Sequence, residues 1–287
     1  MELRVNIGNL HCAVNRNATR VFDNLWDVEV KIFSQWGEDG ILDFLSQKLD
    51  IYKPRVLEIG AGSFYECNSR FLAHSRNASV YAVDSRFDLE KGIKETNLRW
   101  RNTLCYEQVI VDKLNARAIQ NRASNAIGTL DILSIDIDGN DYWIAEQMNL
   151  EEFRIIVVEY NPLFGDREVS VEYSEKSRFE RHPTGLLFGA SLRAWIIKLR
   201  KYKFVFLGTN RVGNNAFFIK HEFIDKVPLK LPDIRDLTRF LDWRCRESRD
   251  ETGQLNYKNY TESLEQIKEL FVINIKNQTK AKLKDCF

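Results

Sequence analysis

The sequence predicts an α/β fold in which a mostly parallel sheet of seven strands ends in an antiparallel hairpin. Short apolar runs alternate with helical patterns over residues 55–161, and this alternation is typical of parallel strands joined by right-handed crossovers. The pattern changes at 203–208 and 216–220, where two apolar runs are separated only by TNRVGNN. That connection is too short for a parallel crossover, so the last two strands must pair as a hairpin.

The elements of this fold can be assigned in order along the chain. Apolar residues recur at helical spacing in GEDGILDFLSQKL (37–49), whose first turn is acidic and suits the helix dipole. Five parallel strands are expected at 55–60, 79–84, 103–111, 131–138 and 153–161. Helices are expected at 67–76, 88–99, 113–124, from Trp143 to Met148, at 190–202 and at 263–271. We divide the chain into an N-terminal extension (1–30), a main domain (31–222) and a C-terminal segment (223–287) packed on it.

Composition narrows the class of protein. A net charge of +1 favours neither nucleic acid nor an acidic membrane surface as partner. The five cysteines are scattered and show no metal or disulfide spacing. The chain shows no secretory signal and no apolar run long enough to span a membrane, so we expect a cytoplasmic monomer or homodimer that acts on a small molecule.

The segment VLEIGAGS (56–63) runs from a strand into a glycine turn that opens a helix. Glycine lets a ligand approach the backbone, and free N–H groups at a helix start attract polar ligand atoms. The third glycine of the dinucleotide fingerprint is missing, because Tyr65 occupies its position. A nucleotide-type cofactor is therefore expected here, although a plain strand-to-helix turn would have the same pattern. The candidate residues are Glu58, Gly60, Ala61, Gly62 and Ser63.

Two further acids follow the next strands. Asp84 ends the second strand, where a carboxylate can accept both ribose hydroxyls of an adenosine ligand, and Ser85 is next to it. Asp112, after the third strand, is a positional candidate for the adenine edge. The alternative for Asp84 is a solvated strand end.

The segment LSIDIDGNDYW (133–143) places three aspartates at the end of the fourth strand. Asp136 and Asp138 share a face of that strand and are candidates for a general base or for cofactor contact. The alternative is that Asp138 shapes a turn and Asp141 starts the next helix. We favour that alternative for Asp138 and Asp141 but not for Asp136.

Other candidates are distributed along the chain. Gln35 (cofactor) and Trp36 (acceptor) lie in FSQWGEDG (33–40), where a capped helix with a core tryptophan is an equal alternative. Carboxylates at 136 or 138, with Glu159 and Asn161, form an oxygen set of the kind that binds Mg²⁺, but a metal is not our expectation. The remaining candidates are His182 as a base, although a lone loop histidine is usually surface, and Tyr160, Asn161, Arg246 and Arg249 for the acceptor. The arginine-rich run also includes Arg244, and such runs are more often solvated or self-paired.

Several of these motifs together resemble a known family. FSQWGEDGIL, VLEIGAGSFYECNSRFL, DILSIDIDGNDYW, VVEYNP, GASLRAW and the NAFF strand, over roughly 32–255, are similar to FkbM-like methyltransferases of the S-Q-x-G-E-D subgroup. The resemblance implies a class I methyltransferase fold, S-adenosylmethionine as cofactor, and O-methylation of a small polar acceptor in surface-polysaccharide or natural-product synthesis. It assigns Glu58, Gly60 and Gly62 to the cofactor turn, Asp84 to ribose and Asp136 to the boundary with the acceptor. The chain departs from the family at Ser63-Phe64, where another glycine is usual.

Two alternatives remain open at this point. An NAD-dependent oxidoreductase would share Asp84 but is disfavoured by Tyr65 and by the terminal hairpin. A non-catalytic protein that binds S-adenosylmethionine would keep the glycine turn without turnover.

Overall fold

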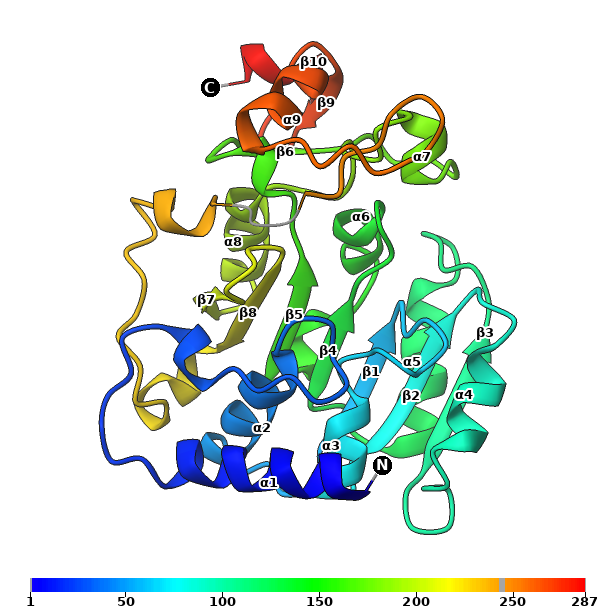
Figure 1. Ribbon diagram of the computed structural model, residues 1–287, viewed down its shortest axis with the longest axis vertical. Helices are drawn as coiled ribbons and strands as arrows, with labels where there is room; N and C mark the ends of the chain where they lie inside the picture. The colour runs from blue at the N-terminus through cyan, green and yellow to red at the C-terminus, as the bar shows by residue number, and fades with distance from the viewer. Residues whose placement is uncertain (1, 243–245, 287) are drawn as a thin grey trace.

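A seven-stranded sheet forms the centre of the molecule in the computed structural model, which describes residues 2–242 and 246–286. Its strand order is β3-β2-β1-β4-β5-β8-β7 (Figure 1). The strands are β1 (Arg55–Ile59), β2 (Ser79–Asp84), β3 (Leu104–Gln108), β4 (Ile132–Ile135), β5 (Ile155–Glu159), β7 (Phe204–Thr209) and β8 (Asn215–Lys220). β1 to β5 pair in parallel, and β8 is antiparallel to β5 and β7. The predicted parallel sheet and terminal hairpin are thereby confirmed.

The strand order reverses between β1 and β4. The chain builds outward from β1 to β3 and then returns to place β4 on the other side of β1. A crevice opens at such a switch point, outside the carboxyl ends of the strands, and ligands of open α/β sheets bind there. The candidate residues at the ends of β1, β2, β4 and β5 all lie at this edge.

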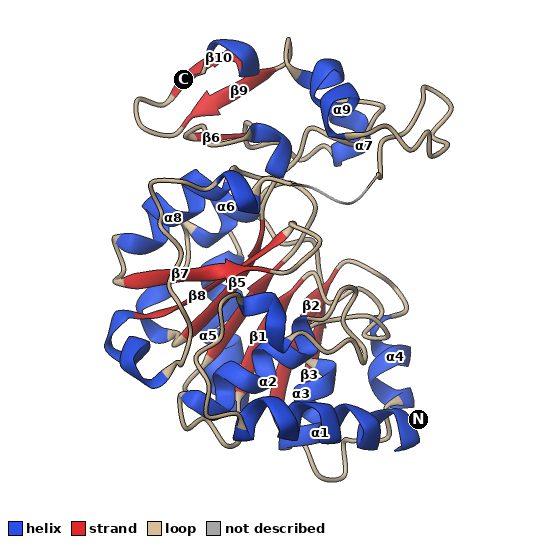
Figure 2. Ribbon diagram, turned by 60° about the vertical axis from the view of Figure 1, so that its left-hand side comes forward, coloured by secondary structure: helices blue, strands red, loops and turns tan. Residues whose placement is uncertain are grey.

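Helices cover both faces of the sheet (Figure 2). They are α1 (Glu2–Asn17), α2 (Glu38–Lys48), α3 (Arg70–Arg76), α4 (Leu89–Glu95), α5 (Ala116–Ile127), α6 (Asp141–Ala145) and α8 (Leu192–Arg200). Short 3₁₀ helices occur at Leu25–Val28, Leu150–Glu152, Pro162–Phe164, His221–Lys226, Thr238–Phe240 and Leu283–Asp285.

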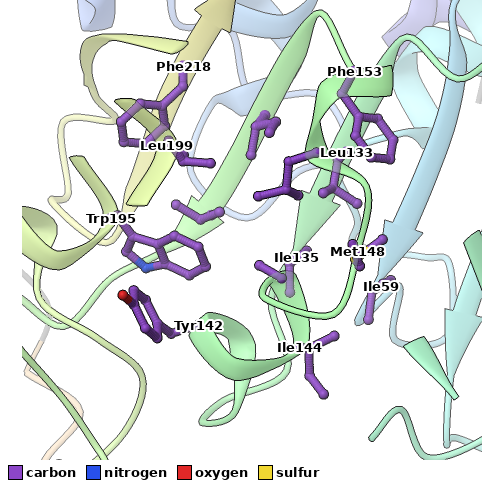
Figure 3. Close-up of a cluster of buried hydrophobic side chains, with 14 of the residues drawn as sticks. Ile59, Leu133, Ile135, Tyr142, Ile144, Met148, Phe153, Trp195, Leu199 and Phe218 are labelled. Atoms are coloured by element: carbon purple, nitrogen blue, oxygen red, sulfur yellow. The ribbon is translucent and has the colours of Figure 1, made fainter. Parts of the chain in front are cut away.

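Each strand divides its side chains between two cores. Leu133 and Ile135 of β4 pack with Trp195 on the side of α5, α6 and α8 (Figure 3). Ile132 packs on the other side, with α2 and α3. Because side chains alternate across a strand, Ser134 and Glu58 also face α3. This orientation matters for Glu58, as described below.

A second, smaller sheet lies beyond the carboxyl ends of β4 and β5 (Figures 1 and 2). Its order is β10-β9-β6, from β6 (Val169–Ser170), β9 (Phe271–Asn274) and β10 (Thr279–Lys282). α7 (Arg178–Arg181) and α9 (Tyr260–Ile267) accompany it. A separate core joins Leu163, Phe164 and Val169 to Ile267, Val272 and Leu283. The C-terminal segment thus combines with the insertion after β5 into one cap over the switch point.

The N-terminal residues are part of the same body. α1 packs on α2 and α3, with Val5 and Cys12 in a small core beside Phe71. Phe22 forms a parallel bridge to Leu229, so the N-terminal extension and the C-terminal segment meet. Within the described ranges, no helix has both the length and the apolar character that a membrane span requires.

Some predicted boundaries were wrong for identifiable reasons. β4 ends at Ile135, not at 138, because the backbone turns at Asp138, whose φ is 58°. The predicted helix 263–271 is α9 only as far as Ile267, and Phe271 begins β9. Its apolar residues fit a helix pattern, but one of them, Phe271, belongs to a strand that pairs with the distant β6.

Candidate active site

Two pockets share a wall at the switch point. The larger, of about 620 Å³, is lined by Gly60, Gly62, Asp84 and Ser85 on one side and by 175–181 of the cap on the other. The smaller, of about 380 Å³, is lined by Gln35, Asp136, Asp138, Glu159, Arg178, Phe188, Asn214, Glu247, Arg249 and Leu255. Asp136, Asp138 and Arg178 line both pockets. A hollow of about 830 Å³ beside the start of β7 contains none of the predicted site residues.

The glycine turn brings β1 against β4. A Cβ atom at Gly60 would lie 1.5 Å from the backbone oxygen of Asp136, so only glycine fits this contact. Gly62 has a φ of +58°, and a Cβ there would meet nothing within 4 Å, because the residue faces the larger pocket. Ala61 is fully buried, and neither it nor Ser63 lines that pocket. Phe64 has a left-handed φ of 64°.

Asp84 is oriented by the glycine turn. Its carboxylate accepts a hydrogen bond from the Gly62 N–H at 2.7 Å and from the Arg86 N–H at 2.9 Å. A carboxylate has about four lone-pair sites, so capacity remains for a ligand in the larger pocket. Ser85 lines the same pocket.

Glu58 does not face the larger pocket, contrary to expectation. Its carboxylate accepts hydrogen bonds from the Asn68 N–H at 2.7 Å, from the Ser69 N–H at 3.0 Å and from the Ser69 hydroxyl. Burial raises its pKa, and these hydrogen bonds oppose the rise. Glu58 therefore organises the turn that begins α3.

Asp112 also has a local partner. Its carboxylate accepts the N–H groups of Leu114 and Asn115, both at 2.8 Å, just before α5. Val109, Ile110 and Val111 line the larger pocket, and Asp112 does not. Asp112 is therefore not placed at the pocket where an adenine contact was expected, whereas its apolar neighbours line that pocket.

The three aspartates after β4 have different surroundings. Asp141 is buried, and its carboxylate accepts the N–H groups of Ile137 at 2.8 Å and Gly139 at 2.9 Å. It is the first residue of α6, as predicted. Asp138 is exposed and forms an ion pair with Arg178 at 2.8 Å. Asp136 is half-buried and lies on the wall that the pockets share.

Asp136 and Glu159 form an unusual pair. Glu159, at the end of β5, is 7% exposed, and its Oε2 atom has no hydrogen-bond partner. Burial raises the pKa of Glu159 well above its ordinary value, and the charge of Asp136 adds to the rise. Burial likewise raises the pKa of Asp136, with a further contribution from Asp138. Both carboxyl groups therefore hold a proton more tightly than they would in water.

Tyr160 and Asn161 are structural residues in this fold. The Tyr160 hydroxyl donates to the backbone oxygen of Phe240 at 2.5 Å. The Asn161 amide donates to the backbone oxygens of Leu186 at 2.9 Å and Phe188 at 3.0 Å. Both residues are fully buried and line neither pocket, so neither is placed to contact an acceptor.

The acidic residues of FSQWGEDG fold this segment into a tight loop. Asp39 accepts the N–H groups of Ile32, Phe33 and Ser34. Glu38 accepts those of Trp36 and Gly37. The loop places Gln35 in the smaller pocket, whereas a cofactor residue was expected in the larger one. Trp36 lines neither pocket and lies under Lys31, whose Nζ atom is 5.5 Å from the ring centroid.

The basic candidates differ in whether they line a pocket. Arg249 lines the smaller pocket, whereas Arg246 is exposed and lines neither pocket. Arg244 lies outside the described residues. His182 ends α7 with its Nδ1 atom 2.7 Å from the Thr184 hydroxyl, and it lines neither pocket. It is not placed to act as a base.

Arg178 is the main residue that the sequence did not indicate. Besides Asp138, it has Glu247 at 3.8 Å, and its guanidinium lies over the rings of Phe179 and Phe188. α7 begins with a capping box in which Ser177 and Glu180 bond reciprocally. The S-x-x-E spacing of this box was the available signal. Asn214 and Glu247 complete the smaller pocket and were also missed.

Comparisons with known proteins add little to this geometry. Neither the protein-family models nor the curated proteins gave a match. The chain is similar to the pyocyanin biosynthetic protein PhzM, with 13% identity, a TM-score of 0.36, and coverage of 63% of this chain and 58% of that one. It is similar to a human methyltransferase 10 domain containing protein with 10% identity and a TM-score of 0.37, and the match covers 76% of this chain and 95% of that one. It is similar to TehB from Haemophilus influenzae with 14% identity and a TM-score of 0.33, and the match covers 64% of this chain and 67% of that one.

The class of fold is given by the sheet itself. Seven strands in the order β3-β2-β1-β4-β5-β8-β7, with β8 alone reversed, have the arrangement of the class I methyltransferase fold that the sequence predicted. The two pockets lie where this class of fold binds its ligands, at the carboxyl ends of the strands.

Proposed function

We propose that the protein is an S-adenosylmethionine-dependent methyltransferase that methylates a hydroxyl oxygen of a small polar acceptor. The observation that carries the proposal is the wall of Asp136, Asp138 and Arg178 between two pockets at the switch point. A cofactor in the larger pocket and an acceptor in the smaller one would meet at this wall.

The larger pocket fits an adenosine-type cofactor. Its volume lies in the usual range for ligand sites, about 300–1,000 Å³. Gly62 leaves the backbone open, Asp84 offers a carboxylate for the ribose hydroxyls, and Val111 offers an apolar surface for the base. S-adenosylmethionine supplies, when bound, an electrophilic methyl group. Tyr65 in place of the third fingerprint glycine argues against a pyrophosphate, and so against NAD.

The residues of the wall position the acceptor and take its proton. The acceptor oxygen forms its new bond to carbon as the sulfur–carbon bond breaks, and the hydroxyl proton must leave. Asp136 lines both pockets, and a raised pKa makes it a stronger base in its ionised form. Arg178 and Arg249 can orient a phosphate or carboxylate on the acceptor. Most of the rate enhancement would come from holding the two reactants in line.

The acceptor is proposed at the level of chemical class only. The smaller pocket is lined mainly by charged and amide side chains, which suits a sugar or a phosphate-bearing metabolite. The family resemblance supports surface-polysaccharide or natural-product synthesis as the setting.

Calorimetric titration with S-adenosylmethionine, S-adenosylhomocysteine and NAD tests the cofactor. We expect both sulfur compounds to bind, and we expect Asp84→Ala to weaken them at least tenfold, because hydrogen bonds to a charged group contribute about 1.5–3 kcal/mol. Asp112→Ala is the matched control, since that carboxylate accepts N–H groups in the turn before α5 and does not line the pocket. The variant should bind both sulfur compounds with wild-type affinity. Binding of NAD alone would refute the proposal.

A further inference from the structure

In the smaller pocket, the half-buried carboxylate of Asp136 and the buried carboxylate of Glu159 have no cation in direct contact among the described residues. Among the described residues, neither Asp136 nor Glu159 accepts a side-chain hydrogen bond or forms an ion pair. Glu159 is more than nine-tenths buried, and one of its oxygens is fully enclosed without a partner. Two such carboxylates cannot both be charged without a large penalty, so the pair must hold either a proton or a cation.

The geometry of the neighbouring oxygens suits a metal ion. One oxygen each from Asp136, Asp138 and Glu159 lie within 4.8 Å of one another. Oxygens on one ion at about 2.0–2.6 Å can be no farther apart than about 4–5 Å. The three groups come from the ends of two adjacent strands, β4 and β5, whose pairing fixes their separation.

The net charge of the smaller pocket also favours a bound cation. Four of its lining side chains are carboxylates and two are guanidinium groups. Arg178 is engaged with Asp138 at 2.8 Å and with Glu247 at 3.8 Å, and Arg249 donates to the Gly253 backbone oxygen at 2.9 Å. The ionised pocket therefore carries two uncompensated negative charges, which a divalent cation would balance.

We propose that Asp136, Asp138 and Glu159 bind a hard divalent cation in the smaller pocket. Carboxylate oxygens are the ligands that Mg²⁺, Mn²⁺ and Ca²⁺ prefer. Asn161, the amide that the sequence analysis paired with these acids, is not a ligand, because its side chain is bonded to Leu186 and Phe188. A cation here would draw acceptor oxygens to the wall between the pockets, and this role rests on the proposed function.

Titration of the full-length protein with Mn²⁺, followed by calorimetry and by the electron paramagnetic resonance signal of free Mn²⁺, tests the site. We expect one ion per chain, and at least tenfold weaker binding in Asp136→Asn and Glu159→Gln. Glu247→Gln is the matched control, because it removes the same charge from the same pocket but not from the ligand set, so its affinity should change less than threefold. Competition with Mg²⁺ and Ca²⁺ shows which ion the site prefers.

Two outcomes would overturn the proposal. One is wild-type protein that binds no Mn²⁺ at millimolar concentration, and the other is Glu159→Gln that binds it as tightly as the wild type. Mn²⁺ binding to the wild type must also strengthen as pH rises and must release protons, because the carboxylate ligands have to ionise. This measurement does not depend on whether any variant folds. Glu159 does not line the larger pocket, so Glu159→Gln should bind S-adenosylhomocysteine normally. Loss of cofactor binding in the wild type would refute the proposed function and leave the Mn²⁺ result intact.

Discussion

Gly60 and Gly62 differ in what a methyl group would meet. At Gly60 the added atom would overlap the Asp136 backbone oxygen, so β1 and β4 would have to separate. At Gly62 the added atom would enter the larger pocket, and the only structural cost is the left-handed backbone, about 1–2 kcal/mol. The two neighbouring positions therefore separate stability from binding.

We expect Gly60→Ala to lose clearly more unfolding free energy than Gly62→Ala, as measured by urea denaturation. Gly62→Ala should lose little more than the backbone cost and yet bind S-adenosylhomocysteine at least tenfold more weakly, since its methyl group occupies ligand space. Equal losses of stability in the two variants would contradict the close contact between Gly60 and Asp136.

Single residues also mark the limit of prediction from sequence. Asp84 and Asp136 were predicted from their positions at or just after the ends of parallel strands, and both line the larger pocket. Glu58, Asp112 and Asn161 matched binding patterns equally well, but each has neighbours in space that satisfy it. The groups that satisfy Asn161 lie in a segment with no readable pattern. Side-chain type and position therefore predicted which edge of the sheet carries the site, but not which polar groups remain free.

At the scale of single elements, the loop 32–37 shows how buried acids can fix a backbone path. Asp39 accepts three N–H groups of this loop while fully buried. Burial raises its pKa from 3.8 to about 7, and the three hydrogen bonds oppose the rise. The folded protein therefore binds a proton at Asp39 more tightly than the unfolded chain does.

This shift predicts how stability depends on pH. The contribution of Asp39 is fully present below about pH 4 and is lost as pH rises to about 7, at up to about 1.4 kcal/mol per pH unit. Asp39→Asn cannot titrate, so the wild type should lose stability relative to this variant over that range. Urea denaturation of both proteins at several pH values measures the difference. A difference that stays constant across the range would show that Asp39 is ionised in the folded protein.

Elements were predicted better than their ends. The apolar runs of β1, β2 and β5 are long enough to identify each strand, because both faces of these strands are buried. β6 has two residues and α7 has four, which is too short for any periodic pattern. These short elements build the cap, so the part of the pocket that the cap contributes was not predictable.

At the scale of the whole molecule, the larger pocket is bounded by the main sheet and by the cap. Residues 175–181 close it from the cap side, and Asn140 ties this segment to α6 through hydrogen bonds to Ser174 and Arg181. A ligand in this pocket would therefore contact two bodies that have separate cores.

Hydrogen exchange measured by mass spectrometry should detect this contact. We expect S-adenosylhomocysteine to slow exchange in residues 60–64, 84–86 and 175–181, since all three segments border the pocket. β9 and β10 serve as an internal control, because they belong to the cap but do not line the pocket, and their exchange should not change. Protection confined to the main sheet would show that the cap does not engage the cofactor.

The pairing of β6 with β9 also determines when the site can be completed during folding. β6 follows β5 directly, whereas β9 lies almost at the end of the described chain. Contacts between segments so far apart in sequence form late, because the intervening chain must first be closed into a loop. The seven-stranded sheet can therefore form before its cap, with the switch point still open to solvent. Residues after 270 lie far from the chemistry, yet they decide when the larger pocket acquires its second wall.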